Sequence, residues 1–375
     1  MNKRNVLNVV SRTWLLALVL SATTTPALEA QEAPSSQSLS LTALAGAAGT
    51  SEEAVPMLGT EVAYQNRNAF RRGHAFEAAV GTTYGRIGYA VLTPVGAFRL
   101  SGTVAPLPAE YEVVTAGVKE ELPIDAPTYA ASLEYLAGTE KLQIAAASSV
   151  IWRAWESNDS DVVAPTDRAS LSQRVGASYW LRRSSWSSNV LAPDSGWRVG
   201  GSYNTAYRRG FESWGREGEL IDHDDRPQHG IDVDFAGLVP LGKESPWAAA
   251  GLSGHWTRSF NGYDRDLPRY GQPVAVGGLG VSGYAPESLP SSRGSLVTAS
   301  LTGALGERAL MSLRFDWFHD HSEEETERRG VGLGLGVRPT DLGSLDLSVG
   351  VAVDPAEGTE FPLAGSLMWK KEMEL

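Results

Sequence analysis

The densest group of potential metal ligands is His319-Asp320-His321, which is followed by four glutamates between residues 323 and 327. Histidine and carboxylate side chains hold divalent metals, and two histidines at i and i+2 on a β-strand share one face. A metal would still need a third ligand to converge on that face from another element. An acidic, solvated rim explains the same residues, and we therefore predict no specific metal site.

Two further histidine groups raise the question of a hydrolase. His223-Asp224-Asp225 lies close to His229 in the sequence, and His255 lies close to Ser253 and Ser259. A histidine beside a serine can activate the hydroxyl as a nucleophile. The chain nevertheless holds no Gly-x-Ser-x-Gly, no His-Glu-x-x-His and no phosphate loop. We predict no enzymatic activity and no cofactor, with a lipid-modifying enzyme as an alternative.

The elements that must position these residues show a period of two. In Val331–Val337 and again in Leu345–Val353, every second residue is a bulky aliphatic and the residues between are Gly, Ala, Ser or Asp. A β-strand sends successive side chains to opposite faces, so each segment has one apolar face and one small or polar face. In a soluble sandwich the apolar face packs inward, whereas in an outer-membrane barrel it faces lipid.

The lengths of the connections favour the barrel. From Thr128 onward, eleven segments of alternating pattern are joined by links that alternate between tight turns and long polar stretches, the long ones near 153–168, 210–228, 261–293 and 319–329. Bacterial barrels sort their connections in this way, with short periplasmic turns and long external loops. Candidate strands before residue 127 are 38–48, 58–68, 74–93 (long, possibly two), 95–104 and 110–118. Five strands there give sixteen in total, and three would give fourteen.

The C-terminal segment carries a further pattern of this class. Residues 361–369 read Phe-x-Leu-x-Gly-x-Leu-x-Trp and are followed by Lys370-Lys371-Glu372-Met373-Glu374-Leu375. The chain resembles the outer-membrane β-barrel proteins of Gram-negative bacteria, in architecture over residues 38–375 and not in any motif of one family. The last strand of that class usually ends on an aromatic residue, and the terminal Leu375 departs from this. The resemblance implies a bacterial outer-membrane location, contact with outer-membrane lipids and lipopolysaccharide, and assembly by the barrel-assembly machinery with periplasmic chaperones.

The first residues are typical of export. Lys3, Arg4 and Arg12 precede the apolar run 14–20, so residues 1–30 are predicted to be a cleaved signal peptide. We expect 31–37 to be a flexible leader and 38–375 to form the barrel. No later stretch reaches the ~20 apolar residues of a membrane-spanning helix. The chain has no cysteine, and its net charge of −12 argues against nucleic acid as a partner.

The opposite face of the predicted strands should line the interior. Charges there favour a water-filled lumen, because burying an unpaired charge is costly. The inner faces of 331–337 and 345–353 are nearly bare, so any selectivity should lie on the wall opposite. The leading hypothesis is a porin-like channel for small polar solutes; the alternatives are a non-conducting barrel with a structural, adhesive or receptor role, and a secreted soluble β-protein. The predicted pore-lining residues are Glu134, Arg174, Arg182, Arg198, Arg208, Asp232, Asp234, Arg314, Asp316 and Asp346.

Overall fold

The fold is known from a computed structural model of the chain. The predicted signal peptide, and all of the predicted leader except Gln37, lie outside the described residues. The structure describes residues 37–49, 54–69, 72–105, 111–115, 118–122, 124–125, 127–157, 159–164, 166, 169–185, 187, 191–208, 213–221, 227–242, 248–260, 269–270, 280–282, 284, 289–290, 293–321, 326–339, 343–353 and 363–374.

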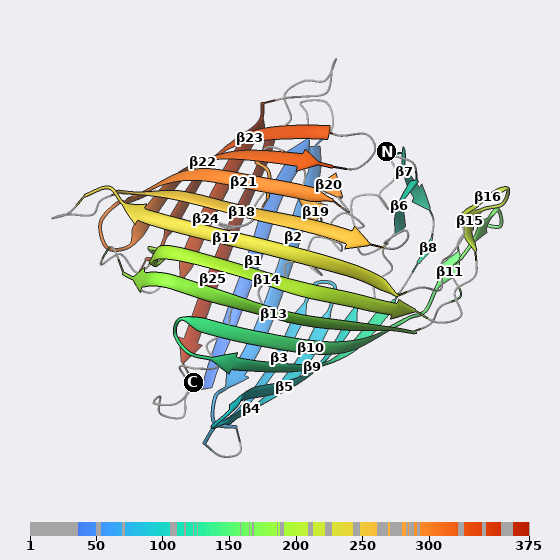
Figure 1. Cartoon of the computed structure of the whole chain (residues 1–375), viewed down its shortest axis with the longest axis horizontal. Coiled ribbons are helices and arrows are strands. Elements are labelled where there is room, and N and C mark those ends of the chain that lie inside the picture. The colour runs from blue at the N-terminus through green and yellow to red at the C-terminus, as the bar shows by residue number, and fades with distance from the viewer. Residues whose placement is uncertain are drawn as a thin grey trace.

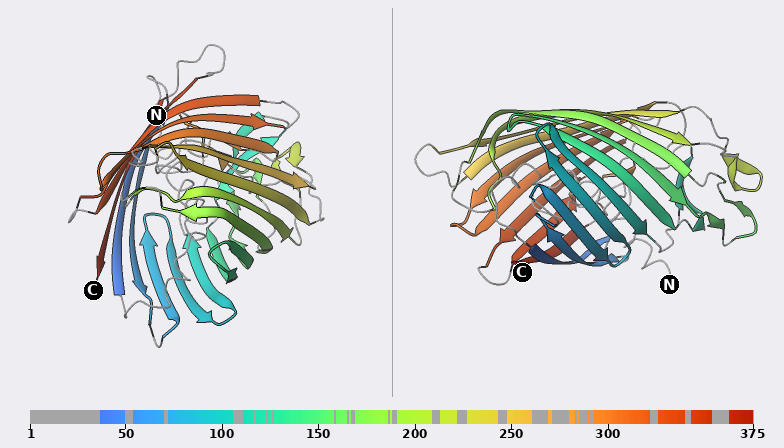
Figure 2. Two further views of the ribbon diagram at one scale, coloured as in Figure 1. Left: turned by 60° about the vertical axis from the view of Figure 1, so that its left-hand side comes forward. Right: turned by 90° about the horizontal axis from the view of Figure 1, so that it is seen from below.

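Sixteen strands of the described residues form one closed antiparallel barrel (Figures 1 and 2), as the sequence predicts. The first strand pairs with the last and closes the sheet. In order around the barrel the strands are β1 (Gln37–Gly49), β2 (Ala54–Asn66), β3 (His74–Gly81), β4 (Gly85–Thr93), β5 (Gly96–Ala105), β9 (Thr128–Gly138), β10 (Leu142–Arg153), β13 (Ala169–Ser184), β14 (Ser195–Arg208), β17 (Gln228–Pro240), β18 (Ala248–Phe260), β21 (Gly294–Ala304), β22 (Ala309–Asp320), β23 (Thr326–Val337), β24 (Ser344–Ala352) and β25 (Leu363–Glu374).

The remaining strands are short and pair outside the barrel sheet. Several of them lie beyond one end of the barrel, at the right in Figure 1. These strands are β6 (Tyr111–Thr115) with β7 (Val118–Leu122), β8 (Ile124–Asp125) with β11 (Glu156–Ser157), β12 (Val162–Val163) with β15 (Trp214–Arg216) and β16 (Glu219–Ile221), and β19 (Arg269–Tyr270) with β20 (Leu289–Pro290).

Five barrel strands precede residue 127, as expected, but two of the candidates differ in detail. The long candidate 74–93 is two strands, because the chain turns at residues 82–84 between β3 and β4. The candidate 110–118 is wrong as a barrel strand: the segment enters the β6–β7 hairpin, and β5 pairs directly with β9. An alternating pattern within one segment predicts a strand but does not determine which other strand it pairs with.

The connections are sorted between the two rims. The turn rim, which carries the end of β25, has the connections at 94–95, 139–141, 305–308 and 338–343, while the short paired strands lie in connections of the opposite, loop rim. Several connections depart from the pattern. On the loop rim, the β1–β2 connection is only 50–53 and the β22–β23 connection is only 321–325, so the long stretch expected near 319–329 is mostly strand. The β3–β4 turn on the loop rim is only three residues long, and the β13–β14 connection on the turn rim spans 185–194.

The exterior of the barrel is apolar. On β23 and β24, the aliphatic residues face outward, with Leu333 50% and Leu347 40% exposed, while the intervening inner positions on these strands are mostly buried. An exposed aliphatic surface of this extent matches the lipid-facing side of a membrane barrel. Among the described residues, no helix is long and apolar enough to cross a bilayer.

Candidate functional site: the barrel lumen

Two regions of the inner face differ in their side chains. We call the inner face of β3–β5, β9, β10, β13, β14, β17 and β18 the charged wall, because Arg, Asp and Glu project from it. We call the inner face of β21–β24 the covered wall, because other parts of the chain lie against it. Both walls belong to the same continuous sheet.

An ion-pair ladder crosses the first part of the charged wall. Arg99 on β5 contacts the Glu77 carboxylate on β3, and its Nη1 lies 3.5 Å from Oε2 of Glu134 on β9. Arg86 on β4, the strand between β3 and β5, also approaches Glu77, with Nε 3.6 Å from Oε1. Glu134 is one of the predicted pore-lining residues, whereas Glu77, Arg86 and Arg99 were not predicted. The alternation that could have found them is visible around Arg99, which lies between two outward-facing neighbours, Phe98 and Leu100.

A second network is centred on Asp232 of β17. Thr257 Oγ1 donates a hydrogen bond of 2.8 Å to Oδ1 of Asp232, and Ser202 Oγ donates one of 3.2 Å to Oδ2. Asn204 Nδ2 also donates to Oδ2. Arg174 joins the network through its Nε, which donates to Ser202 Oγ at 3.2 Å. Four neighbouring strands are therefore tied together at one level of the lumen.

Two predicted pore-lining residues near the turn rim, Arg182 and Arg198, do not lie opposite each other. Arg198 lies opposite Trp180 on β13, and its Nη2 is 3.6 Å from Oδ2 of Asp234. Arg182 falls in a β-bulge and has a positive φ of 59°, so simple alternation does not fix its face.

Two other predicted residues lie near opposite rims of the barrel. The backbone of Arg208 pairs with Ser170 at the loop end of β14, and its side chain lies outside the described residues. Asp346 lies on β24 near the turn rim, opposite the inner position of Gly336 on β23.

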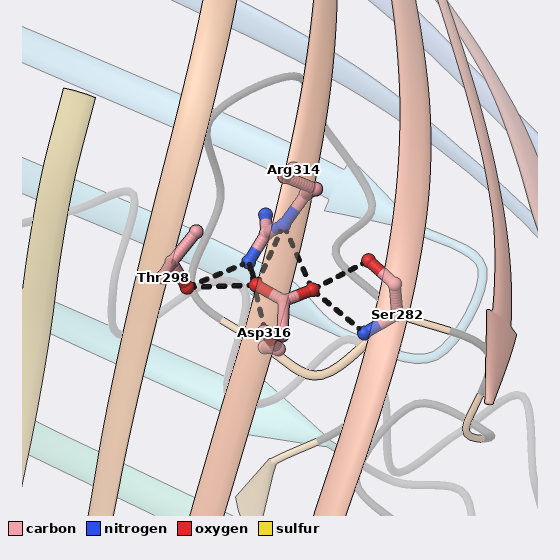
Figure 3. A network of polar contacts seen from close by, with 5 residues as sticks. Ser282, Thr298, Arg314 and Asp316 are labelled. Carbon is pink, nitrogen blue, oxygen red and sulfur yellow. Dashed lines mark hydrogen bonds and ion pairs between the residues drawn. The ribbon is translucent and has the colours of Figure 1, made fainter. Parts of the chain in front are cut away.

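The covered wall holds a buried carboxylate, Asp316 on β22, whose exposed fraction is 0%. Figure 3 shows its side chain between Arg314, Thr298 and Ser282. Asp316 accepts hydrogen bonds from Thr298 Oγ1 at 2.7 Å, from the Ser282 amide at 3.0 Å and from Ser282 Oγ at 2.6 Å. Arg314 donates to the same carboxylate through Nε and Nη2. Both charges are therefore paired and hydrogen-bonded, which offsets the cost of their burial.

These contacts fasten an inward-folded segment, residues 280–282, to the barrel wall. Arg314 Nη2 donates a hydrogen bond of 2.8 Å to the carbonyl oxygen of Gly280. Val281 packs in a buried apolar cluster with Leu296 and Phe318 of the wall. Arg314 and Asp316 thus lie on the inner face, as predicted, but beneath this segment.

Glycines of β23 make room for the inward-folded segment. A Cβ at Gly330 would lie 2.0 Å from the carbonyl oxygen of Ser282, and one at Gly332 would lie 2.3 Å from Ser282 Oγ. The backbone can approach β23 closely only because these inner positions have no side chain. The inner face that looks bare in the sequence is the surface on which this segment rests.

A second inward-folded segment, Leu191–Ala192, lies near the turn rim over the junction of the two walls, because the cluster beneath it includes Ala249 of β18. These residues belong to the β13–β14 connection and pack against a buried cluster of Ala249, Ala304 and Leu310. The Cδ1 atom of Leu191 would lie 3.4 Å from a Cβ at Gly336. Both ends of the covered wall are therefore overlaid by chain, whereas the ion pairs of the charged wall remain partly accessible.

The histidine groups of the sequence analysis lie apart from one another. His319 is on the outer face, with Nδ1 3.6 Å from Oε1 of Glu327 and its ring stacked on Trp317. His255 is on the inner face, with Nε2 3.9 Å from Oδ1 of Asp232. The group 223–225 lies outside the described residues. In the described part of the chain, no three His, Cys, Asp or Glu side chains are grouped as metal ligands.

Comparison with known proteins gives the fold and no family. No family model matches the sequence, and no curated protein matches it. Among solved structures, CdiB from Acinetobacter baumannii is similar with a TM-score of 0.59 and 11% identity over 89% of this chain, which spans 60% of that CdiB. BamA from Haemophilus ducreyi lacking POTRA domains 1–3 is similar with a TM-score of 0.60 and 12% identity, covering 91% of this chain and 71% of that one.

The chain has the fold of a bacterial outer-membrane β-barrel. A porin, OccK11 (OpdR) of Pseudomonas aeruginosa, is similar with a TM-score of only 0.45 and 10% identity, covering 91% of this chain and 96% of that one, and this likeness carries no weight for function. The closed barrel and its apolar exterior locate the protein in the bacterial outer membrane, as the sequence predicts.

Proposed function

We propose that this barrel is a narrow, porin-like channel through which small polar solutes diffuse along the charged wall. The observation that carries the proposal is the partial exposure of the ion pairs on that wall. Arg198 and Asp234 have side chains 38% and 36% exposed, although both point into the barrel. Charged groups remain exposed inside a barrel at low cost when water fills the space beside them.

The two inward-folded segments set the shape of the proposed route. Residues 280–282 overlie the covered wall near the loop rim, and residues 191–192 overlie its edge with β18 near the turn rim. A solute would therefore pass between these segments and the charged wall, where Arg and Glu or Asp side chains alternate in space. Charged side chains around a pore govern which solutes enter, so we assign selectivity to Arg99, Glu134 and Asp234. The proposal includes no enzymatic step and no cofactor.

The same segments support a second candidate, a non-conducting barrel with a structural or receptor role. The side chain of Asp316 is fully buried beneath residues 280–282, so this part of the interior is closed. If the overlay extends across the lumen, the barrel holds no continuous path.

Planar-bilayer recording on the purified full chain separates the two candidates. The channel predicts discrete openings, and Arg99→Gln should shift the reversal potential in a salt gradient toward cation preference, because one positive charge leaves the wall. Heat-modifiable gel mobility verifies that each sample is folded. Absence of openings from folded protein would reject the channel in favour of the closed barrel.

A further inference from the structure

One row of inner positions on the charged wall crosses five neighbouring strands, which lie side by side in Figure 1. Each member of the row is the register partner of the next, so all of them project from the same face of the sheet. From β5 to β14 the row consists of Arg99, Glu134, Ala147, Arg174 and Asn204. We call it the central row.

The central row contains a gap between two opposite charges. Neighbouring strands lie ~4.8 Å apart, so the two spacings across β10 place the backbones of Glu134 and Arg174 about 10 Å from each other. The residue between them is Ala147, whose methyl side chain fills little of this space. Ala145, the next inner residue of β10 toward the turn rim, is exposed. The gap is therefore open to the lumen.

Arg174, on one side of the gap, differs from other arginines of the charged wall. Arg86, Arg99 and Arg198 each lie beside a carboxylate. Among the described residues, Arg174 forms no ion pair, and its hydrogen bond is the one from Nε to Ser202. The side chain is exposed. Its two Nη groups are therefore available to a solute, and a guanidinium matches both oxygens of a carboxylate.

Asp232 does not supply the missing partner, because both of its carboxylate oxygens accept hydrogen bonds from other groups. Oδ1 accepts from Thr257, and Oδ2 accepts from Ser202 and Asn204. Arg174 reaches this network only through the hydroxyl of Ser202. The network therefore holds the guanidinium in position through Nε and leaves its Nη groups unpaired.

Glu134 supplies the negative charge on the other side of the gap. Its Oε2 lies 3.5 Å from Nη1 of Arg99, which is a long contact, and Oε1 has no contact of this kind among the described residues. The side chain is 35% exposed. A carboxylate in this state can accept hydrogen bonds from an ammonium group in the lumen.

A solute that carries both charges close together matches the two sides of the gap. A simple carboxylate is attracted by Arg174 and repelled by Glu134, and a simple ammonium ion meets the reverse. We propose that the gap over Ala147 binds zwitterionic solutes of the α-amino acid type. The carboxylate lies on the Nη groups of Arg174, and the ammonium group lies on Glu134. This inference rests on the proposed channel function and names the class of its solutes.

The test is a titration of the purified, folded barrel in detergent with glycine, measured by saturation-transfer NMR. Glycine should bind about tenfold more tightly than acetate or methylammonium, because each of these ions keeps only one of the two charges. Acetate binding as tight as that of glycine would overturn the proposal and show a simple anion site. Equally tight binding of methylammonium would overturn it in favour of a simple cation site.

Variants of the two charged residues test their roles in the gap. Arg174→Gln and Glu134→Gln should each weaken glycine binding by about tenfold. The matched controls are Arg308→Gln and Glu307→Gln, which remove the same charges from exposed positions in the turn between β21 and β22 and should leave binding unchanged. Glycine affinities of the two gap variants equal to those of the controls would overturn the proposal.

Ala147→Leu tests the gap without changing a charge. The larger side chain should fill the space between Glu134 and Arg174 and remove glycine binding from a barrel that keeps its heat-modifiable gel mobility. Unchanged glycine binding by this variant would contradict the site. Planar-bilayer recording separates this inference from the channel itself: openings without glycine binding reject the site alone, and glycine binding without openings rejects the channel alone.

Discussion

The charged wall and the covered wall obey the same alternation of outward aliphatic and inward small or polar residues. Their inner positions nevertheless differ in what they contact. On the charged wall, long side chains such as Arg99 and Glu134 pair with each other across strands. On the covered wall, Gly330 and Gly332 leave space that Ser282 fills. The comparison shows that a small inner face in a barrel can be a docking surface for the chain itself and need not border water.

The contrast is sharpest between two aspartates. Asp316 is fully buried and binds Arg314, Thr298 and Ser282, whereas the side chain of Asp234 is 36% exposed and faces Arg198 at 3.6 Å. Removing one partner from a buried pair leaves an uncompensated charge, whereas an exposed pair contributes little. The same substitution made at these two aspartates should therefore lower the free energy of unfolding by very different amounts.

The largest effect is expected for Asp316→Ala. The substitution leaves Arg314 buried without its carboxylate, so the free energy of unfolding should fall by about 3–5 kcal/mol. Urea unfolding of the barrel in lipid vesicles measures the loss. The matched variant Asp234→Ala should cost less than about 1 kcal/mol, and similar losses for both would contradict the distinction between the walls.

A loss of about 2–4 kcal/mol is expected for Leu333→Arg, because this outward side chain would place a charge in the middle of the bilayer. From the sequence alone, the inner face of β24 would border water, and an arginine in place of the inward residue Ser348 would be tolerated. The exposed fraction of Ser348 in the structure is only 6%, so we expect Ser348→Arg to be destabilising as well. Urea unfolding in lipid vesicles measures both losses. An unchanged free energy of unfolding for Ser348→Arg would mean that water reaches the inner face of β24.

A smaller loss, about 1–3 kcal/mol, is expected for Gly330→Ala, because the new Cβ would meet the backbone of Ser282 and push residues 280–282 away. The control is Gly200→Ala on β14. Its Cβ would lie 2.7 Å from Oδ1 of Asp234, the end of an exposed side chain that can move. Equal losses of stability for Gly330→Ala and Gly200→Ala would show that residues 280–282 move aside as readily as the Asp234 side chain.

The smallest effect concerns Tyr84, in the β3–β4 turn at the loop end of the charged wall. Burial and the hydrogen bond that its hydroxyl donates to Glu61 raise the pKa of this phenol above its ordinary value of 10.0. A raised folded-state pKa adds stability that is present below the unfolded pKa and is lost as the pH rises through the folded value. Wild-type stability should therefore fall more steeply above pH 10 than that of Tyr84→Phe.

Spectrophotometric titration checks the assignment to Tyr84 directly. Tyr84→Phe should remove absorbance change from the most alkaline part of the tyrosine titration. If the lost amplitude lies in the ordinary range near pH 10, the phenol is not held by Glu61.

The sequence predicted much of this barrel because alternation is a local property of each strand. The outward face of β23 and most of the sorted connections follow from residues close together in the chain. The total of sixteen strands is also as predicted, because the division of 74–93 into two strands offsets the loss of 110–118. Trp180 lies opposite Arg198 on the inner face, because its neighbours Tyr179 and Leu181 face outward. The bulge that follows at Arg182 breaks the alternation, so the face of the Arg182 side chain could not be predicted.

The covered wall could not be predicted, because its contacts join residues distant in sequence. Nothing in the spacing of Gly330 and Gly332 says that Ser282 will occupy the space they leave. Arg314 and Asp316 were found as inward charges, since alternation fixes their face. Their role beneath residues 280–282 depends on where a long connection folds, and local patterns do not encode that.

The pairing of β1 with β25 has a consequence for how the barrel folds. Twelve residue pairs, from Ser38 with Glu374 to Gly49 with Leu363, join the first and last strands. Until the final segment has been synthesised and exported, the growing sheet keeps two unpaired edges, and such edges invite aggregation. Closure also requires contacts of very high sequence separation, which slow folding. Because β25 is synthesised last, its pairing with β1 is the step that removes the unpaired strand edges at which other chains could add.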